Sequence, residues 1–256
     1  MWAAGVTFIG HSTVLISVGR TSLLTDPWLR SRLLGVRRAR PPSQSPADLR
    51  GIDGVLVSHA HADHLDPATL RRLPRVPLCV PAGAERYVAG LGFPDVRVLD
   101  PWGATRIGEA EIVAVPAQHA GGRWRPRTGG VCGFVVSGRG RSVLFVGDVD
   151  MEPTTHFDEM AARFDIDVAL LPIAGMLPLS YYERRKHKPA VHVDPSGAID
   201  MFVRSGARRM IPIHWGTLMI GMGPRDQAPT RLLQLARDRG IDGRVVVLEH
   251  GGTLRL

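Results

Sequence analysis

A run of apolar residues that ends in a cluster of histidines and aspartates constrains this chain more than any other stretch. Residues 54–70 read GVLVSHAHADHLDPATL, so a strand-like segment is followed at once by HAHADHLD. Asp66 and Pro67 then indicate a helix start, and Asp194 and Pro195 indicate another, because a capping carboxylate before a first-turn proline favours one. A buried strand, a polar turn and a capped helix predict an α/β fold with functional groups at strand ends.

The rest of the chain shows a similar alternation. Short β-type runs dominate the first half, whereas the second half alternates helical patterns with strands. We expect helices at 153–164, 195–206 and 229–240, and strands at 167–172, 209–214 and 244–249. Many strands in each half, with helices between them, predict two packed sheets flanked by helices, an α/β (α+β) sandwich. A length of 256 residues is typical of one domain, which we expect to span 1–256.

Composition limits the class of protein. Apolar residues make up 44% and charged residues 22%, as in a globular protein with a sizeable core. We see no signal peptide and no apolar run of the roughly 18 residues that a membrane span needs. Cys79 and Cys132 are too few for a disulfide framework, so we expect buried, reduced thiols and a cytoplasmic location.

The net charge of the chain is strongly positive. The formal net charge is +8, and 30 of the 32 basic residues are arginines, with clusters at 30–40, 123–127 and 184–188. Arginine suits phosphate and carboxylate, and a basic balance can attract nucleic acid, an anionic lipid surface or a small anionic substrate. For each cluster taken alone, a solvated face is the simpler interpretation.

The histidine cluster has the composition of a metal site. His59 and His61 point to the same side while the chain stays extended, because side chains alternate along a strand. Asp63 and His64 follow in the turn, so two ligands can face one metal and two a neighbouring metal. Imidazole and carboxylate together suit zinc, and also manganese or iron.

Three more candidate ligands follow apolar strands later in the chain. His119 ends EIVAVPAQH, Asp148 ends SVLFVGD and His214 ends RMIPIH. Taken alone, each could equally be a structural residue that caps an element or has its hydrogen bonds satisfied within the fold. Their shared context, beside the first motif, favours the functional interpretation.

These residues resemble the metallo-β-lactamase superfamily over nearly the whole chain: SHAHADHLD, then QH at 118–119, GD at 147–148 and HWGT at 214–217. The stretches FIGHSTVLISVGRTSLLTDPWLRSR, HVDPSGAIDMF and IPIHWGTL are most similar to the branch that holds N-acylphosphatidylethanolamine-hydrolysing phospholipase D and ascorbate-6-phosphate lactonase. The resemblance implies a four-layer αββα sandwich with a dinuclear metal site at one edge.

The resemblance also implies a ligand set. His59, His61 and His119 would hold the first metal, and Asp63, His64 and His214 the second, with Asp148 bridging the two. The implied ions are two divalent metals, Zn²⁺ first and Mn²⁺ or Fe²⁺ next. Aspartate rather than cysteine at the bridge argues against the true β-lactamases that use cysteine there. Histidine at 61 argues against the oxygen-reducing diiron branch.

The implied reaction is hydrolysis by a hydroxide that the two metals share, with Asp63 and Asp148 as catalytic residues. The expected substrate is an anionic phosphodiester, as in phospholipase D, because RWRPR begins four residues after His119. A lactone or ester of an anionic small molecule is the alternative. Candidate substrate contacts are His11, Arg123, Arg125, His192 and Trp215. His11 matches the N-terminal motif of the family, and it could equally stand behind the metal ligands or be structural. His192 could equally be structural, and Trp215 a core residue.

Two other classes of function remain to be compared. The net charge suggests a nuclease or nucleic-acid binder, but the chain has no room for the inserted clamp domain of the nuclease branch. A purely structural metal is usually a single ion held mainly by cysteines, which seven histidine and aspartate candidates fit poorly. We therefore expect a small anionic or lipid-like partner rather than nucleic acid. The oligomeric state stays open.

Overall fold

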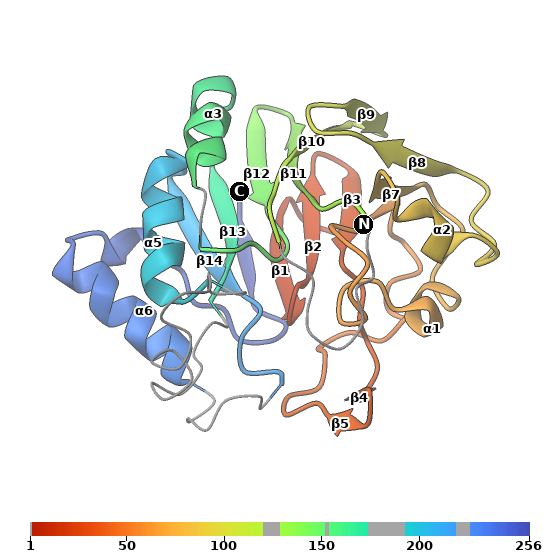
Figure 1. Cartoon of the computed structure of the whole chain (residues 1–256), viewed down its shortest axis with the longest axis horizontal. Coiled ribbons are helices and arrows are strands. Elements are labelled where there is room, and N and C mark those ends of the chain that lie inside the picture. Colours follow the sequence, from red (N-terminus) through yellow and green to blue (C-terminus); the bar gives the residue numbers. More distant parts are fainter. Residues whose placement is uncertain (1, 120–128, 152–153, 174–192, 219–225) are drawn as a thin grey trace.

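The computed structural model describes residues 2–119, 129–151, 154–173, 193–218 and 226–256. Two β-sheets pack face to face, and helices cover the outer face of each, which gives four layers in the order α, β, β, α (Figure 1). The predicted sandwich of two sheets flanked by helices is confirmed.

The first sheet has seven strands in the order β15-β1-β2-β3-β6-β7-β8. Their bounds are β1 (Gly5–Gly10), β2 (Thr13–Val18), β3 (Thr21–Thr25), β6 (Gly54–Leu56), β7 (Leu78–Pro81), β8 (Val96–Leu99) and β15 (Thr253–Arg255). β1, β2 and β3 form an antiparallel meander, whereas β6, β7 and β8 are added parallel to β3. β1, β3 and β6 therefore all run in one direction.

The second sheet has six strands in the order β14-β13-β12-β11-β10-β9. Their bounds are β9 (Ala104–Ile107), β10 (Ala110–Pro116), β11 (Cys132–Gly138), β12 (Arg141–Phe145), β13 (Val168–Pro172) and β14 (Arg209–Ile213). Pairing is antiparallel from β9 to β12 and parallel from β12 to β14. β10, β12 and β14 therefore also share a direction.

The helices separate into two groups (Figure 1). α1 (Pro67–Leu70) and α2 (Glu85–Val88) lie outside the first sheet, and α3 (Thr155–Arg163), α5 (Pro195–Arg204) and α6 (Gln227–Asp238) lie outside the second. The carboxylates of Asp66 and Asp194 accept first-turn backbone N–H groups of α1 and α5, as predicted for both caps. No helix in the described part of the chain has the length and apolar character that a bilayer crossing requires.

The core lies mainly between the sheets. Phe8 of β1 and Ile16 of β2 belong to the same buried cluster as Phe134 of β11, Phe145 of β12 and Leu170 of β13. Full burial of such a side chain contributes about 1.5–3 kcal/mol relative to leaving it exposed. Cys79 and Cys132 are buried free thiols, as expected. Burial raises the pKa of Cys79 to about 12, so this thiol stays protonated.

One predicted strand is wrong. Residues 244–249 make only an isolated bridge, Val245 with Met210, after a short 3₁₀ turn at Asp242–Arg244. The chain touches the edge strand β14 at this point and then crosses to the first sheet, where β15 pairs with β1. Three consecutive valines indicate β propensity but not which edge the strand pairs with. The basic segment 30–40 contains a hairpin that we did not predict, β4 (Arg32–Leu33) with β5 (Val36–Arg37).

Candidate metal centre

Six strand ends supply the side chains of this site. Because β1, β3 and β6 are parallel to one another, as are β10, β12 and β14, the carboxyl ends of three strands in each sheet can meet at one edge. The residues that follow these ends are, in order, His11, Asp26, His59, His119, Asp148 and His214. The turn after His59 adds His61, Asp63 and His64.

The first cluster consists of His59, His61, His119 and Asp148. His59 Nε2 lies 2.9 Å from His61 Nδ1, and His119 Nε2 lies 3.9 Å from Asp148 Oδ2. The structure therefore brings together the three histidines expected at the first metal, with the expected bridging carboxylate beside them.

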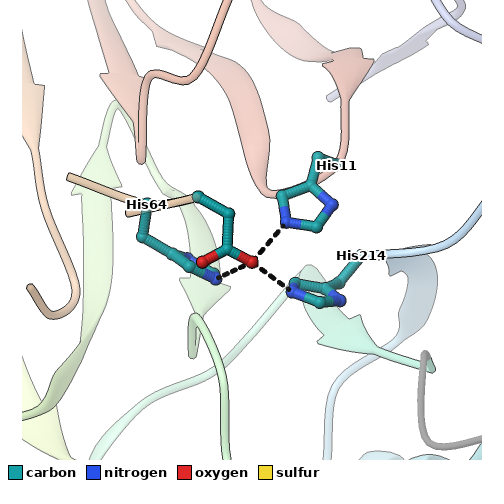
Figure 2. A group of neighbouring side chains, drawn as sticks. His11, His64 and His214 are labelled. Carbon is teal, nitrogen blue, oxygen red and sulfur yellow. Dashed lines mark hydrogen bonds and ion pairs between the residues drawn. The ribbon is translucent and has the colours of Figure 1, made fainter. Parts of the chain in front are cut away.

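The second cluster consists of Asp63, His64 and His214, joined by His11. One carboxylate oxygen, Asp63 Oδ2, lies 3.1 Å from His11 Nε2, 3.6 Å from His214 Nε2 and 3.8 Å from His64 Nε2. The dashed lines of Figure 2 show the three imidazoles converging on that oxygen. The expected second set is thus assembled, with one histidine more than the expectation included.

Asp148 faces both clusters. Its Oδ1 lies 3.3 Å from His214 Nε2 and its Oδ2 lies 3.2 Å from His64 Nε2, on the side of the second cluster. The carboxylate is 1% exposed. Gly147 turns the chain into this position with φ +65°, and a Cβ at Gly147 would stand 2.3 Å from Ser58 Oγ. The Gly-Asp pair therefore reflects a local steric requirement.

The spacing of these donors fits metal ions. Donor atoms about 2.1 Å from one ion must stand about 3 to 3.5 Å apart. The separations of 3.2 Å between His64 Nε2 and Asp148 Oδ2 and of 3.3 Å between His214 Nε2 and Asp148 Oδ1 lie in this range. The donor set is imidazole nitrogen and carboxylate oxygen, which divalent zinc, iron and manganese accept.

Burial sets the protonation of the imidazoles. Desolvation is the main cause that lowers the pKa of His59 well below its usual value and that of His61 to about 4. Both rings are therefore neutral at pH 7, with a lone pair available to a metal.

In the second cluster, charged neighbours outweigh the effect of burial on the pKa values. Burial opposes charge on His64, but Asp148, Asp63 and Asp26 around it raise the pKa of His64 well above its usual value. Burial likewise opposes ionisation of Asp63, yet His64 and the hydrogen bond from His11 hold the pKa of that carboxyl low. The carboxylates around His64 thus stabilise a positive charge in the second cluster.

Two carboxylates that sequence reasoning missed stand behind the candidate ligands. Asp26 Oδ2 lies 2.6 Å from His64 Nδ1, and Asp150 Oδ1 lies 3.1 Å from His119 Nδ1. Such partners fix the tautomer so that the other ring nitrogen faces the metal. Their position in the sequence could have identified them, because Asp26 directly follows β3 and Asp150 lies two residues beyond Asp148.

The expected substrate contacts have different placements. Arg123, Arg125 and His192 lie outside the described residues. Trp215 is 4% exposed, donates its indole N–H to Pro212 O and stacks on Phe8, so packing alone accounts for it. Of the two candidates that the structure describes, His11 lies among the candidate metal ligands and Trp215 does not.

The fold and the paired clusters define a class of protein, the αββα sandwiches with histidine and aspartate clusters at one edge of the sheets. Residues 21–215 match the family model of the beta-lactamase superfamily domain. The chain belongs to the metallo-β-lactamase superfamily. The expected family and fold are therefore confirmed.

Curated relatives agree with this assignment. A UPF0173 metal-dependent hydrolase of Pyrococcus furiosus is 30% identical, over 98% of this chain and 99% of its own length. N-acyl-phosphatidylethanolamine-hydrolyzing phospholipase D 1 of Caenorhabditis elegans is 29% identical, over 96% of this chain and 74% of its own length. An uncharacterised Mycobacterium tuberculosis protein is 30% identical over 90% of this chain, which spans 63% of that relative.

Solved structures show the same fold. A "possible metal-dependent hydrolase" of Veillonella parvula superposes over its whole length with a TM-score of 0.79 at 20% identity. CmlA, a diiron beta-hydroxylase of Streptomyces venezuelae, matches all of this chain and 55% of its own length, with a TM-score of 0.73 at 23% identity.

Proposed function

We propose that this protein is a dinuclear metallohydrolase that cleaves an anionic phosphodiester. The observation that carries the dinuclear part is the position of Asp148, whose two oxygens face imidazoles of both clusters. A carboxylate in that position can join two ions, and paired ions of this kind are typical of enzymes that hydrolyse phosphate esters.

The proposed ligands follow from the two clusters. His59, His61 and His119 would hold one ion, Asp63, His64 and His214 the other, and Asp148 would contact both. Divalent ions bound there supply an activated water and polarise the oxygen of the bond that breaks. Zinc is our first choice, because every proposed ligand is an imidazole or a carboxylate. The diiron neighbour supports including iron in any test.

The side chains have separate tasks. Asp63 Oδ2, directed into the second cluster, can accept a hydrogen bond from the attacking water and orient it toward phosphorus. Asp26 and Asp150 hold His64 and His119 from behind. In the overall reaction the water oxygen forms a new P–O bond, the ester P–O bond breaks, and the alcohol leaves with a proton.

Two observations support an anionic diester as substrate. The Caenorhabditis relative is named for hydrolysis of a phospholipid diester. A cavity of 480 Å³ is lined by Arg30, Arg32 and Arg72, close along the chain to Asp26 and to the helix that follows His64. Guanidinium groups that line a cavity suit a phosphate-bearing group, a lipid headgroup among them. Arg123 and Arg125 stay predicted contacts.

The test is hydrolysis of a chromogenic phosphodiester by protein loaded with zinc, manganese or iron. Removal of a ligand shared by two ions should lower kcat/KM of Asp148→Ala by about 100- to 1000-fold or more. Asp165→Ala is the matched control, because Asp165 is exposed and pairs with Arg208 at the amino ends of β13 and β14, the opposite end of β14 from His214.

The outcomes separate the parts of the proposal. Full activity of Asp148→Ala, or fewer than two bound ions in the wild type, would contradict the dinuclear centre. Two bound ions with turnover of lactones or carboxylic esters, but not of phosphodiesters, would contradict the substrate class alone.

A further inference from the structure

We infer that His11 is a positioning residue that holds Asp63 in place for the second metal ion. The family resemblance does not imply it as a ligand, and the sequence leaves open whether it stands behind the ligands, faces the substrate or is structural. His11 Nε2 lies 3.1 Å from Asp63 Oδ2, closer than either His64 or His214 lies to that oxygen (Figure 2). This inference rests on the dinuclear centre proposed above.

The backbone at His11 is held in an uncommon conformation. His11 has φ +65° and His214 has φ +57°, a region that residues other than glycine rarely adopt. The two are joined directly, because the His214 N–H donates to the His11 carbonyl over 2.9 Å. His11 follows β1 of one sheet and His214 follows β14 of the other. Backbone strain of this kind concentrates at functional sites, where surrounding contacts maintain it.

The side chain of His11 is held as firmly as its backbone. The ring is 2% exposed. Its centroid lies 3.9 Å from that of His214, and it meets Trp28 edge to face at 5.1 Å. These rings leave His11 little freedom to turn, so its Nε2 stays directed at Asp63.

The hydrogen-bond pattern distinguishes a donor from a ligand. A neutral imidazole carries one N–H. His11 Nδ1 is buried and has no hydrogen-bond partner among the described residues. An N–H placed there would be unsatisfied, at a cost of about 1–3 kcal/mol. Placed on Nε2, the same N–H donates to Asp63 Oδ2. His11 therefore acts on the metal through Asp63 rather than by binding it.

The experiment is titration with cobalt(II) alone of metal-free wild type, His11→Asn and His11→Gln. Affinity is read from the visible absorption of bound cobalt. Both amides replace the ring, but only the longer glutamine side chain reaches about as far as Nε2. Asparagine tolerates positive φ, so His11→Asn should preserve the backbone. His250→Gln is the matched control, because His250 packs beside Gly10 and Phe8 outside both clusters.

We expect two equivalents of cobalt in the wild type and in His250→Gln. His11→Asn should weaken one of the two equivalents by about 10- to 100-fold, as loss of a ligand's hydrogen-bond partner typically does. His11→Gln should restore that equivalent to within about threefold of the wild type. Thermal unfolding of the metal-free proteins reports any purely structural effect.

Three results would overturn the inference. Equal weakening in both variants would make His11 a direct ligand. Wild-type affinity for both equivalents in His11→Asn, with only a lower Tm, would make it structural. Fewer than two equivalents in the wild type would remove the dinuclear centre and this inference together.

Discussion

Asp26 shows how a single buried carboxylate can serve both clusters. It is 0% exposed, and its Oδ2 receives the Ser58 hydroxyl at 2.6 Å and His64 Nδ1 at 2.6 Å. The same hydroxyl lies 2.9 Å from His59 Nδ1. With its proton donated to Asp26, the hydroxyl accepts the His59 N–H. One carboxylate thereby orients a histidine from each cluster, and its own charge is stabilised by these donors.

At this scale we predict that Asp26→Asn weakens metal binding at both clusters by about 10- to 100-fold. If the amide oxygen accepts the Ser58 hydroxyl and the His64 N–H, the amide NH₂ faces the Ser58 backbone N–H, and two donors then oppose each other. Competition with a fluorescent chelator measures the affinities. Asp53→Asn is the control, since Asp53 accepts the Ser22 N–H in the same sheet. Equal affinities for wild type and Asp26→Asn would contradict the prediction.

The turns between strands hold the two sheets together through Glu109. This residue lies between β9 and β10 of the second sheet and accepts hydrogen bonds from Arg139, in the turn between β11 and β12, at 2.8 and 2.9 Å. It also accepts the backbone N–H of Arg20, in the turn between β2 and β3 of the first sheet, at 3.1 Å. One carboxylate therefore contacts turns from both layers.

We expect this contact to depend on pH. Hydrogen bonds from Arg139 and from the Arg20 backbone lower the pKa of Glu109 to about 2, against 4.5 normally. A carboxyl group with a lowered folded-state pKa stabilises the fold above its unfolded pKa and loses this effect as pH falls through the folded value. The Tm advantage of wild type over Glu109→Gln should be present at pH 6, shrink below about pH 4.5 and vanish near pH 2.

The effect should be small, because exposed ion pairs contribute little. Thermal unfolding at a series of pH values measures it, with Glu111→Gln, an exposed carboxylate on β10, as control. A Tm difference that stays constant from pH 6 to pH 2 would show that Glu109 acts by packing and not by charge.

For the whole molecule, the centre joins the two sheets. The first cluster combines His59, after a strand of the first sheet, with His119 and Asp148, after strands of the second. The second cluster combines His11 and His64 from the first side with His214 from the second. These donors separate when the sheets unfold, so metal should bind the folded state alone and stabilise it.

We therefore predict that chelation lowers the Tm. At free metal about 100 times the Kd, each site adds about 2.7 kcal/mol, and 1 kcal/mol corresponds to about 2–4 °C in a chain of this size. Removal of both ions should lower the Tm by about 10 °C or more, with reversal on adding zinc. Calorimetry with and without chelator measures this, and Asp148→Ala should respond less. An unchanged Tm would contradict metal binding at the sheet edge.

The amino-acid sequence by itself determined the sandwich class, most helices and strands, and the seven candidate ligands. Strand periodicity, the caps at Asp66 and Asp194 and the spacing within SHAHADHLD depend on residues close together in the chain, so they are readable from it. The strand predicted at 244–249 was wrong, because whether a segment pairs depends on a sheet edge that lies far away in the sequence. Only the tertiary structure decided which buried side chains meet. His11 and Asp63 are 52 residues apart in the sequence, and His64 and Asp26 are 38 residues apart. No local pattern encodes such contacts, because they form only when β1, β3 and β6, which are far apart in the sequence, assemble into one sheet.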